Sequence, residues 1–261
     1  MLRTVSAHLE LTVFEPAHLA FSVAVAPAGA RESMLITFDG TPIESIERDD
    51  AGNRLHTLDV PAGRVILDYS AEFAGRAPAP VVDEVELLRY LRPSRYCESD
   101  ALAPTARAEF GGLKGADVLA AVSSWVGQKL AYVPGSSLPT DGAVRTLLSR
   151  QGVCRDYAHL VIALLRALDV PARLVAVYAP GLDPMDFHAV AEAYVEGAWH
   201  VVDATLLAPR ASLLRISTGR DAADTAFLSS FHGALTLDGI SVGAVVDALP
   251  GDDPRDLAVI G

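Results

Sequence analysis

The sequence predicts an α+β protein, with an N-terminal antiparallel β-sandwich followed by helices packed on a second antiparallel sheet. Three observations lead to this fold class. Apolar and polar residues alternate with a period of two over residues 1–75, the apolar spacing becomes helical from about residue 117, and strand-like segments return after Pro171. A run of strands, a run of helices and a second run of strands together indicate segregated α and β structure.

The first part of the chain reads as short strands separated by turns. Val5, Ala7, Leu9, Leu11 and Val13 alternate with polar residues, which is the pattern of a strand with one buried face. Similar segments cover residues 19–25, 34–38, 43–47, 55–60 and 65–73, with turn residues between them. We therefore expect residues 1–92 to form a β-sandwich domain that carries no chemistry.

The composition changes between residues 76 and 116. Ala77-Pro78-Ala79-Pro80 is a linker signal, and Pro93 and Pro104 prevent one long helix across this stretch. A short helix is expected over residues 84–91. We predict a linker over residues 93–116 and a second domain over residues 117–261.

Three helices are expected next. The first has an apolar face at positions 119, 122, 126 and 130. The second is capped by Thr140 or Asp141, and the third begins at or near Cys154 and ends before Pro171. Strands are then predicted over residues 173–178, 187–195 and 199–203, with Glu196-Gly197 as the hairpin turn between the last two.

Charge and cysteine content exclude several classes of function. The chain has 21 Lys+Arg against 33 Asp+Glu, a net charge of −12, which argues against binding nucleic acid or an anionic membrane. Two cysteines are too few for a disulfide framework, and no Cys/His spacing suggests zinc. No apolar stretch is long enough to span a bilayer, and Glu10 and Glu15 interrupt the place of a signal peptide. A cytoplasmic location without a cofactor is therefore expected, and the oligomeric state stays open.

Cys154 is the first candidate for chemistry. It follows Gly152-Val153 and opens a helix, so its thiol lies at the positive end of the helix dipole, which favours the thiolate. Its backbone N–H is then free to stabilise an oxyanion. The alternative is a small buried cysteine, because free cysteine is among the most buried residue types.

His188 and Asp203 strengthen the chemical reading of Cys154. With Glu196-Gly197 as a two-residue loop, Asp203 pairs with Val190, so His188 is its diagonal neighbour on the same face. A carboxylate beside an imidazole fixes the tautomer of the ring and stabilises its protonated form. Together with Cys154, the pair has the composition of a cysteine triad. His200 has the opposite parity in the hairpin and is expected to point away.

Four segments resemble the core of the transglutaminase-like superfamily: RQGVCRDYAHL at residues 150–160, LLRALDVPAR at 164–173, FHAVAE at 187–192 and WHVVDAT at 199–205. Cysteine, histidine and aspartate occur in the family's order, and Leu130-Ala131-Tyr132 is similar to its lead-in. The β-rich first part, with its exit at residues 91–96, resembles the N-terminal region of bacterial members described as candidate cysteine proteases.

The resemblance implies a papain-like core with Cys154 as nucleophile, His188 as general base and acid, and Asp203 as the orienting carboxylate. It also implies acyl transfer through a thioester, with a peptide or protein as substrate. The backbone N–H of Cys154 would supply one oxyanion donor. Tyr132 and Trp125 are candidates for a second, although the position of Trp125 favours a core role.

Three functions are compatible with this reading. The first is hydrolysis of a peptide, isopeptide or side-chain amide. The second is joining glutamine to an amine as a protein-glutamine gamma-glutamyltransferase, and the third is a non-catalytic binding module on the same fold.

Several neighbouring residues are expected to be structural. Asp156 suits the first helical turn and is placed away from the thiol. Arg155 and Arg173 are expected in salt bridges, and His159 lies roughly 140° around the helix from Cys154. The segment from Gly219 to Asp224 is expected to be structural or to form the rim of a cleft.

Overall fold

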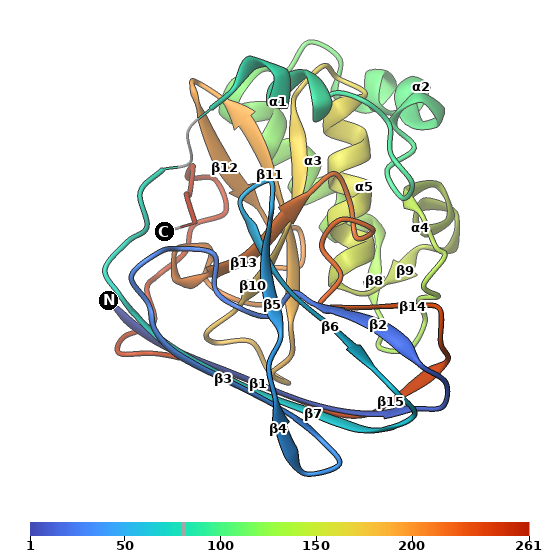
Figure 1. The fold of residues 1–261 in the computed structure, drawn as a ribbon. Helices are drawn as coiled ribbons and strands as arrows, with labels where there is room; N and C mark the ends of the chain where they lie inside the picture. The colour runs from blue at the N-terminus through green and yellow to red at the C-terminus, as the bar shows by residue number, and fades with distance from the viewer. Residues whose placement is uncertain (80–81, 261) are drawn as a thin grey trace.

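The computed structural model describes residues 1–79 and 82–260. The Pro80 end of the linker signal and Gly261, at the end of the predicted second domain, lie outside the described residues. The structure is a mixed one in which two antiparallel sheets form a sandwich and a third carries the helices on one face, so the predicted fold class is confirmed (Figure 1).

The sandwich is built mainly from the first strands of the chain. These are β1 (Leu2–Val13), β2 (Ala17–Phe21), β3 (Arg31–Phe38), β4 (Thr41–Ile43), β5 (Ile46–Asp50), β6 (Asn53–Val60) and β7 (Gly63–Ala74). Strand β1 alternates strictly between buried and less buried residues, so its period of two gives one face to the shared core. Leu9, Leu19, Phe21 and Leu67 are fully buried in that core.

Two strands from the end of the chain complete these sheets. The sheet orders are β15-β1-β7-β3-β4 and β14-β2-β6-β5, where β14 is Leu228–Phe231 and β15 is Leu235–Val246. In Figure 1 the red β15 lies beside the blue β1 at the bottom of the view. The sequence assigns residues 228–246 to the second domain, whereas their strands pair with those of the first.

The segment predicted as one strand over residues 43–47 is instead two strands in different sheets. A turn at Asp39-Gly40, with φ of 48° and 80°, folds β4 back on β3, and a turn at Ala51-Gly52, with φ of 53° and 87°, joins β5 to β6. Strand β4 pairs with β3 in one sheet, and β5 pairs with β6 in the other. The chain therefore passes from one sheet to the other between Ile43 and Ile46.

The predicted linker over residues 93–116 contains a helix. Helix α1 (Glu84–Arg89) ends before Pro93, as expected, but α2 (Ser99–Phe110) includes Pro104. Leu102, Ala106 and Phe110 of α2 are buried against the helical core. The apolar spacing of these three residues stabilises the helix despite the proline.

The second half packs its helices against one face of a four-stranded antiparallel sheet. Helices α3 (Gly115–Lys129), α4 (Ala143–Ser149) and α5 (Cys154–Arg166) follow, with short strands β8 (Ala131–Tyr132) and β9 (Gln151–Gly152) between them. The sheet has the order β12-β11-β10-β13, from β10 (Ala172–Tyr178), β11 (His188–Val195), β12 (Ala198–Val202) and β13 (Leu214–Gly219), with a short 3₁₀ turn at Arg210–Ser212. Every residue of α5 from Asp156 to Arg166 is buried, which makes α5 the central helix in Figure 1.

The start of α4 differs from the prediction. Its N-cap is Gly142, not Thr140 or Asp141. The carboxylate of Glu98 accepts the backbone N–H of Ala143 at 2.8 Å. An acidic side chain from outside the helix therefore satisfies a free N–H group at its positive end.

The hairpin between β11 and β12 has the predicted register. Val195 pairs with Ala198 and Ala191 pairs with Val202, and Glu196-Gly197 form the turn with φ of 53° and 82°. These positive values are typical of a type I′ turn, which matches the twist of the strands it joins. Two arginines also hold strand β11 in place through Glu192. This residue is fully buried and accepts hydrogen bonds from Arg173 at 2.9 Å and from Arg215 at 2.6 Å.

Across the described ranges 1–79 and 82–260, none of the helices has the length and apolar character that crossing a membrane requires.

We predict that Glu192→Gln lowers the free energy of unfolding by about 3–5 kcal/mol, because it leaves Arg173 and Arg215 without their buried counter-charge. Urea unfolding followed by circular dichroism measures the change. Asp253→Asn is the matched control, because it breaks an ion pair with Arg255 on the surface and should leave the unfolding midpoint unchanged. Equal effects of the two substitutions would contradict a structural role for the buried cluster.

Candidate active site

Cys154 lies at the first turn of α5, directly after a short parallel ladder. Tyr132 of β8 pairs with Gly152 of β9, and the helix begins two residues later. A Cβ atom built at Gly152 would lie 2.7 Å from Cβ of Asp156. Glycine is therefore required here because the chain passes close to the side chain of Asp156.

Asp156 acts on the helix and not on the thiol. It is 1% exposed, and its Oδ2 accepts the backbone N–H of Val153 at 2.8 Å while Oδ1 accepts the Ser137 hydroxyl at 2.9 Å. The expectation that Asp156 lies away from the reactive group is confirmed by these contacts. Its carboxylate satisfies an N–H group of the helix N-terminus.

His188 and Asp203 are in contact, as the predicted hairpin geometry requires. Nε2 of His188 donates to Oδ2 of Asp203 at 2.8 Å, and both side chains are almost completely buried. The other oxygen of Asp203 accepts from the backbone N–H of Thr205 at 2.9 Å and from its hydroxyl at 2.6 Å. The imidazole is thereby held in one orientation, with Nδ1 as its remaining nitrogen.

The protonated form of His188 is stabilised by its surroundings. Burial acts to lower the pKa of His188, but the charge of Asp203, the hydrogen bond to Asp203 and the Cys154 thiol together raise it to about 10. Burial likewise acts to raise the pKa of Asp203, and the charge and hydrogen bond of His188 outweigh it, so this pKa is lowered. The two shifts describe one buried ion pair.

Cys154 and His188 line the same pocket. The Cys154 thiol is one of the groups that raise the pKa of His188, and Nε2 of the ring is occupied by Asp203. Nδ1 is the ring nitrogen that remains, and it has no hydrogen-bond partner among the described residues. Such contacts are often loose in a site without substrate and tighten in the complex.

Tyr132 also lies against Cys154. Burial and the charge of the Cys154 thiolate raise the pKa of Tyr132 to about 12, whereas the backbone N–H of Cys154 acts to lower it. The phenol of Tyr132 is therefore close enough to Cys154 for the two side chains to influence each other electrostatically. The other candidate, Trp125, donates to Glu109 at 3.0 Å and contacts the ring of Phe110, which agrees with the core role that its position favours.

A pocket of about 370 Å³ opens beside Cys154 and His188. Arg155, Asp186 and Tyr96 supply further polar groups to its lining, and most of the remaining lining is apolar. The sequence alone did not identify this pocket, because its wall combines β10, β11 and β13 with Ser22 and with residues 222–228.

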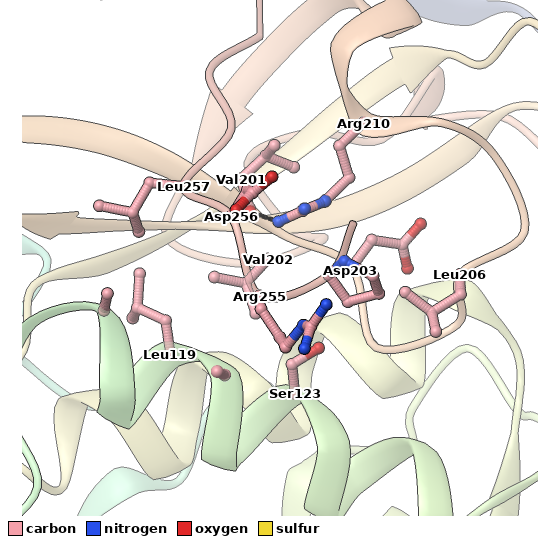
Figure 2. Close-up of a pocket in the computed structure, with 13 residues that line it drawn as sticks. Leu119, Ser123, Val201, Val202, Asp203, Leu206, Arg210, Arg255, Asp256 and Leu257 are labelled. Carbon is pink, nitrogen blue, oxygen red and sulfur yellow. Dashed lines mark hydrogen bonds between the residues drawn. The ribbon is translucent and has the colours of Figure 1, made fainter. Parts of the chain in front are cut away.

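A second pocket lies behind Asp203 and is shown in Figure 2. Leu119 and Ser123 of α3 line it on one side, and Val202 and Leu206 line it on another. Its volume is about 10 Å³, which is at the limit for one water molecule. It is therefore too small for a substrate.

The C-terminal segment supports the loop that follows Asp203. Arg210 forms a bidentate pair with Asp252 at 2.8–3.1 Å, and the backbone N–H of Val201 donates to Ala258 at 2.8 Å. Figure 2 shows Arg210 and the chain around Asp256 meeting beside Val201. Sequence reasoning missed this support, because an arginine and an aspartate so far apart carry no local signal.

The other residues near the site are structural. Arg173 pairs with Glu192 and Glu86, and its guanidinium lies 3.9 Å from the centre of the Trp199 ring. Arg155 donates to the backbone oxygen of Leu138 at 2.8 Å and to the Ser137 hydroxyl. Arg155 also forms a salt bridge with the buried carboxylate of Asp156 at 3.5 Å, so both arginines have the structural role expected of them.

His159 is buried and away from Cys154. Its Nε2 accepts the backbone N–H of Ala222 at 3.1 Å, and its ring stacks on Tyr96. Burial lowers the pKa of His159 to about 3, so the ring is neutral. Arg220 and Asp224 form an ion pair that holds the loop carrying Ala222 at the pocket rim, which agrees with both roles expected of this segment.

Over the described ranges, no group of three or more His, Cys, Asp and Glu side chains is arranged to hold a metal ion.

Comparison with known proteins identifies a shared architecture. The Transglutaminase-like superfamily profile matches residues 106–204, from α2 to the residue after Asp203. A candidate cysteine protease from Cytophaga hutchinsonii, solved at 1.9 Å, is 33% identical with a TM-score of 0.87, and the match covers 98% of this chain and 95% of that one. The similarity therefore includes the sandwich as well as the segment matched by the profile.

Curated relatives match over shorter regions. An uncharacterised protein of Mycobacterium leprae is 30% identical over 129 residues, which is 45% of this chain and 46% of that protein. A protein of Mycobacterium tuberculosis is 38% identical over 74 residues, or 24% of its length. The matched regions thus span less than half of these relatives.

We predict that Asp203→Asn lowers the pKa of His188 from about 10 toward or below its ordinary value of about 6.5, because burial then acts with little opposition. Nuclear magnetic resonance of the imidazole C–H groups follows this titration. In the native protein, the stabilisation from His188 is complete below pH of about 6.5 and is lost as the pH rises through about 10. The variant should lack this fall in the free energy of unfolding.

Asp68→Asn is the control for this titration. Asp68 contacts His8 at 2.7 Å on the surface, so its substitution should change His8 and leave His188 unaffected. A pKa of His188 that is the same in Asp203→Asn and in the native protein would contradict the ion pair.

Proposed function

Because the chain belongs to the transglutaminase-like superfamily, we propose that it catalyses cysteine-dependent acyl transfer on amide bonds. Cys154 is the nucleophile, His188 is the general base and acid, and Asp203 is the orienting carboxylate. The observation that carries the proposal is the buried contact of 2.8 Å between His188 and Asp203, beside a pocket that Cys154 and His188 both line.

The first half of the reaction forms a thioester. The sulfur of Cys154 attacks the amide carbonyl carbon as a thiolate, and its proton is held on Nδ1 of His188. The oxygen becomes an oxyanion, which the backbone N–H of Cys154 and the hydroxyl of Tyr132 stabilise. The C–N bond then breaks as His188 returns the proton to the leaving amine.

The second half releases the acyl group. Water gives a proton to His188 and attacks the thioester carbonyl. The C–S bond then breaks, the sulfur leaves as a thiolate beside the protonated His188, and the product is a carboxylic acid. An amine taking the place of water would give transamidation instead. We favour hydrolysis because Cys154 is only partly buried and Tyr132 is 41% exposed, so water reaches the site. A reducing cytoplasm would keep the free thiol of Cys154 in its reactive form, so we place the activity there.

We predict that iodoacetamide labels Cys154 roughly 100-fold faster than Cys97 in the folded protein, because a thiol paired with an imidazole reacts as a thiolate. Cys97 is the internal control: it is 0% exposed, and burial raises the pKa of its thiol. Mass spectrometry of the digested protein measures both rates over a range of pH. His188→Ala should slow the labelling of Cys154 and change its pH dependence, and denaturant should make the two cysteines similar. Equal labelling rates for Cys154 and Cys97 in the folded protein would contradict the proposed role of Cys154 as nucleophile.

We predict that casein incubated with the enzyme and a primary amine gains free carboxyl groups or is cleaved, without incorporation of the amine. Mass spectrometry separates these products, since deamidation adds about one mass unit and an amine adduct adds the mass of the amine. Cys154→Ala is the control for spontaneous change. An amine adduct as the main product would replace hydrolysis by transamidation.

A further inference from the structure

The pocket beside Cys154 is chemically divided. Its polar and charged groups include Cys154 and Asp186, which are partly or well exposed. Leu174 and Ile216, which also line it, are each 1% exposed. His188, Ser22 and Thr225 also line the pocket and are buried, and Ser22 Oγ has no hydrogen-bond partner among the described residues. The thiol and Asp186 therefore lie toward solvent, and the interior is mostly hydrocarbon with a few buried polar groups.

The apolar wall of the pocket is formed by the sheet of the second half and by the segment that leads into β14. Leu174 and Ala176 come from β10 and Ile216 from β13, whereas Phe227 and Leu228 come from the segment that enters the sandwich. The backbone N–H of Ser22 donates to Phe227 at 2.9 Å, and the ring of Phe227 stacks on Phe187 at 5.1 Å. Because the wall is built before substrate arrives, binding requires little rearrangement.

The volume and lining restrict what the pocket accepts. About 370 Å³ is in the range of sites that hold small organic groups. A charged side chain would lose its hydration against Leu174 and Ile216, and a carboxamide would lose hydrogen bonds to water there. An aromatic or branched aliphatic side chain would instead bury its surface favourably.

We propose that this pocket receives a bulky apolar side chain on the acyl side of the cleaved amide, so that the substrates are peptides with an aromatic or branched aliphatic residue at one of the two positions before that bond. This proposal rests on the proposed function. It distinguishes the chain from an enzyme whose acyl donor is a glutamine side chain, because such a chain would not fill the apolar interior.

Peptidyl chloromethyl ketones test the preference, because they alkylate the thiol only after their side chains bind. N-acetyl-Xaa-Gly and N-acetyl-Gly-Xaa reagents, with Xaa as Phe, Leu, Ala, Gln or Glu, are compared by intact-mass measurement of the rate at Cys154. Phe or Leu at one position should exceed Ala roughly 10-fold or more, and Gln and Glu should not. Each rate is divided by that for iodoacetamide, which reports the thiol alone.

Replacing alanine by leucine at two positions tests whether the side-chain preference arises in this pocket. Ala176→Leu fills the interior from β10 and should reduce the normalised rate for the favoured reagent to that for Ala. Ala198→Leu adds the same group at a half-buried position of β12 that does not line the pocket, and it should leave the preference unchanged. Equal rates for all side chains, or faster reaction with Gln or Glu, would overturn the proposal.

Binding to a protein without the thiol separates this proposal from the proposed function. Calorimetry of Cys154→Ala with the corresponding peptide amides should give at least roughly 10-fold tighter binding for Phe or Leu than for Gln. If the preference is found but Cys154 of the native chain is not labelled rapidly, the proposed pocket specificity is supported and the proposed nucleophile is contradicted. If Cys154 is labelled rapidly but the preference is absent, the proposed nucleophile is supported and the proposed pocket specificity is contradicted.

Discussion

Burying an imidazole beside a carboxylate is costly unless the two neutralise each other, and this constraint governs the geometry of the site. His188 and Asp203 satisfy it with one contact of 2.8 Å, and Thr205 occupies the other carboxylate oxygen. The ring cannot turn without leaving a buried charge unpaired. Its second nitrogen is therefore held in one direction, and the position of α5 relative to the hairpin sets how Cys154 lies against the ring.

The surrounding structure holds these two elements in place. Asp156 binds the start of α5, and Gly152 leaves room for that carboxylate. On the hairpin, Glu192 ties Arg173 and Arg215 to the middle of the sheet. Buried polar groups with several partners each thus surround the site on both sides, whereas the pocket beside Cys154 is mostly apolar. The groups that fix the geometry of the site are therefore distinct from most of those that line the pocket.

Local signals predicted much of this arrangement. The two-residue turn at Glu196-Gly197 was enough to place His188 beside Asp203, because strand parity and loop length fix the register of a hairpin. The predicted start of a helix at Cys154 is confirmed, and Cys154 became a candidate nucleophile only together with His188 and Asp203. Residues whose partners lie far away gave no such signal: Glu98 binds the start of α4, and Arg210 binds Asp252. The pocket wall could not be predicted from the sequence either. Phe227 belongs to the connection between β13 and β14, which lie in different sheets, and only the folded chain brings it to the pocket.

Strand β15 has a consequence for how the protein is made. It pairs with β1 along almost its full length, from Arg3 with Val246 to Val13 with Leu235. During synthesis the first strand emerges from the ribosome long before the last, and domains usually fold as soon as they are complete. Here the sandwich cannot close its larger sheet until the segment carrying Cys154, His188 and Asp203 has been synthesised. The β region and the site region therefore mature together, and contacts between such distant strands favour slow folding.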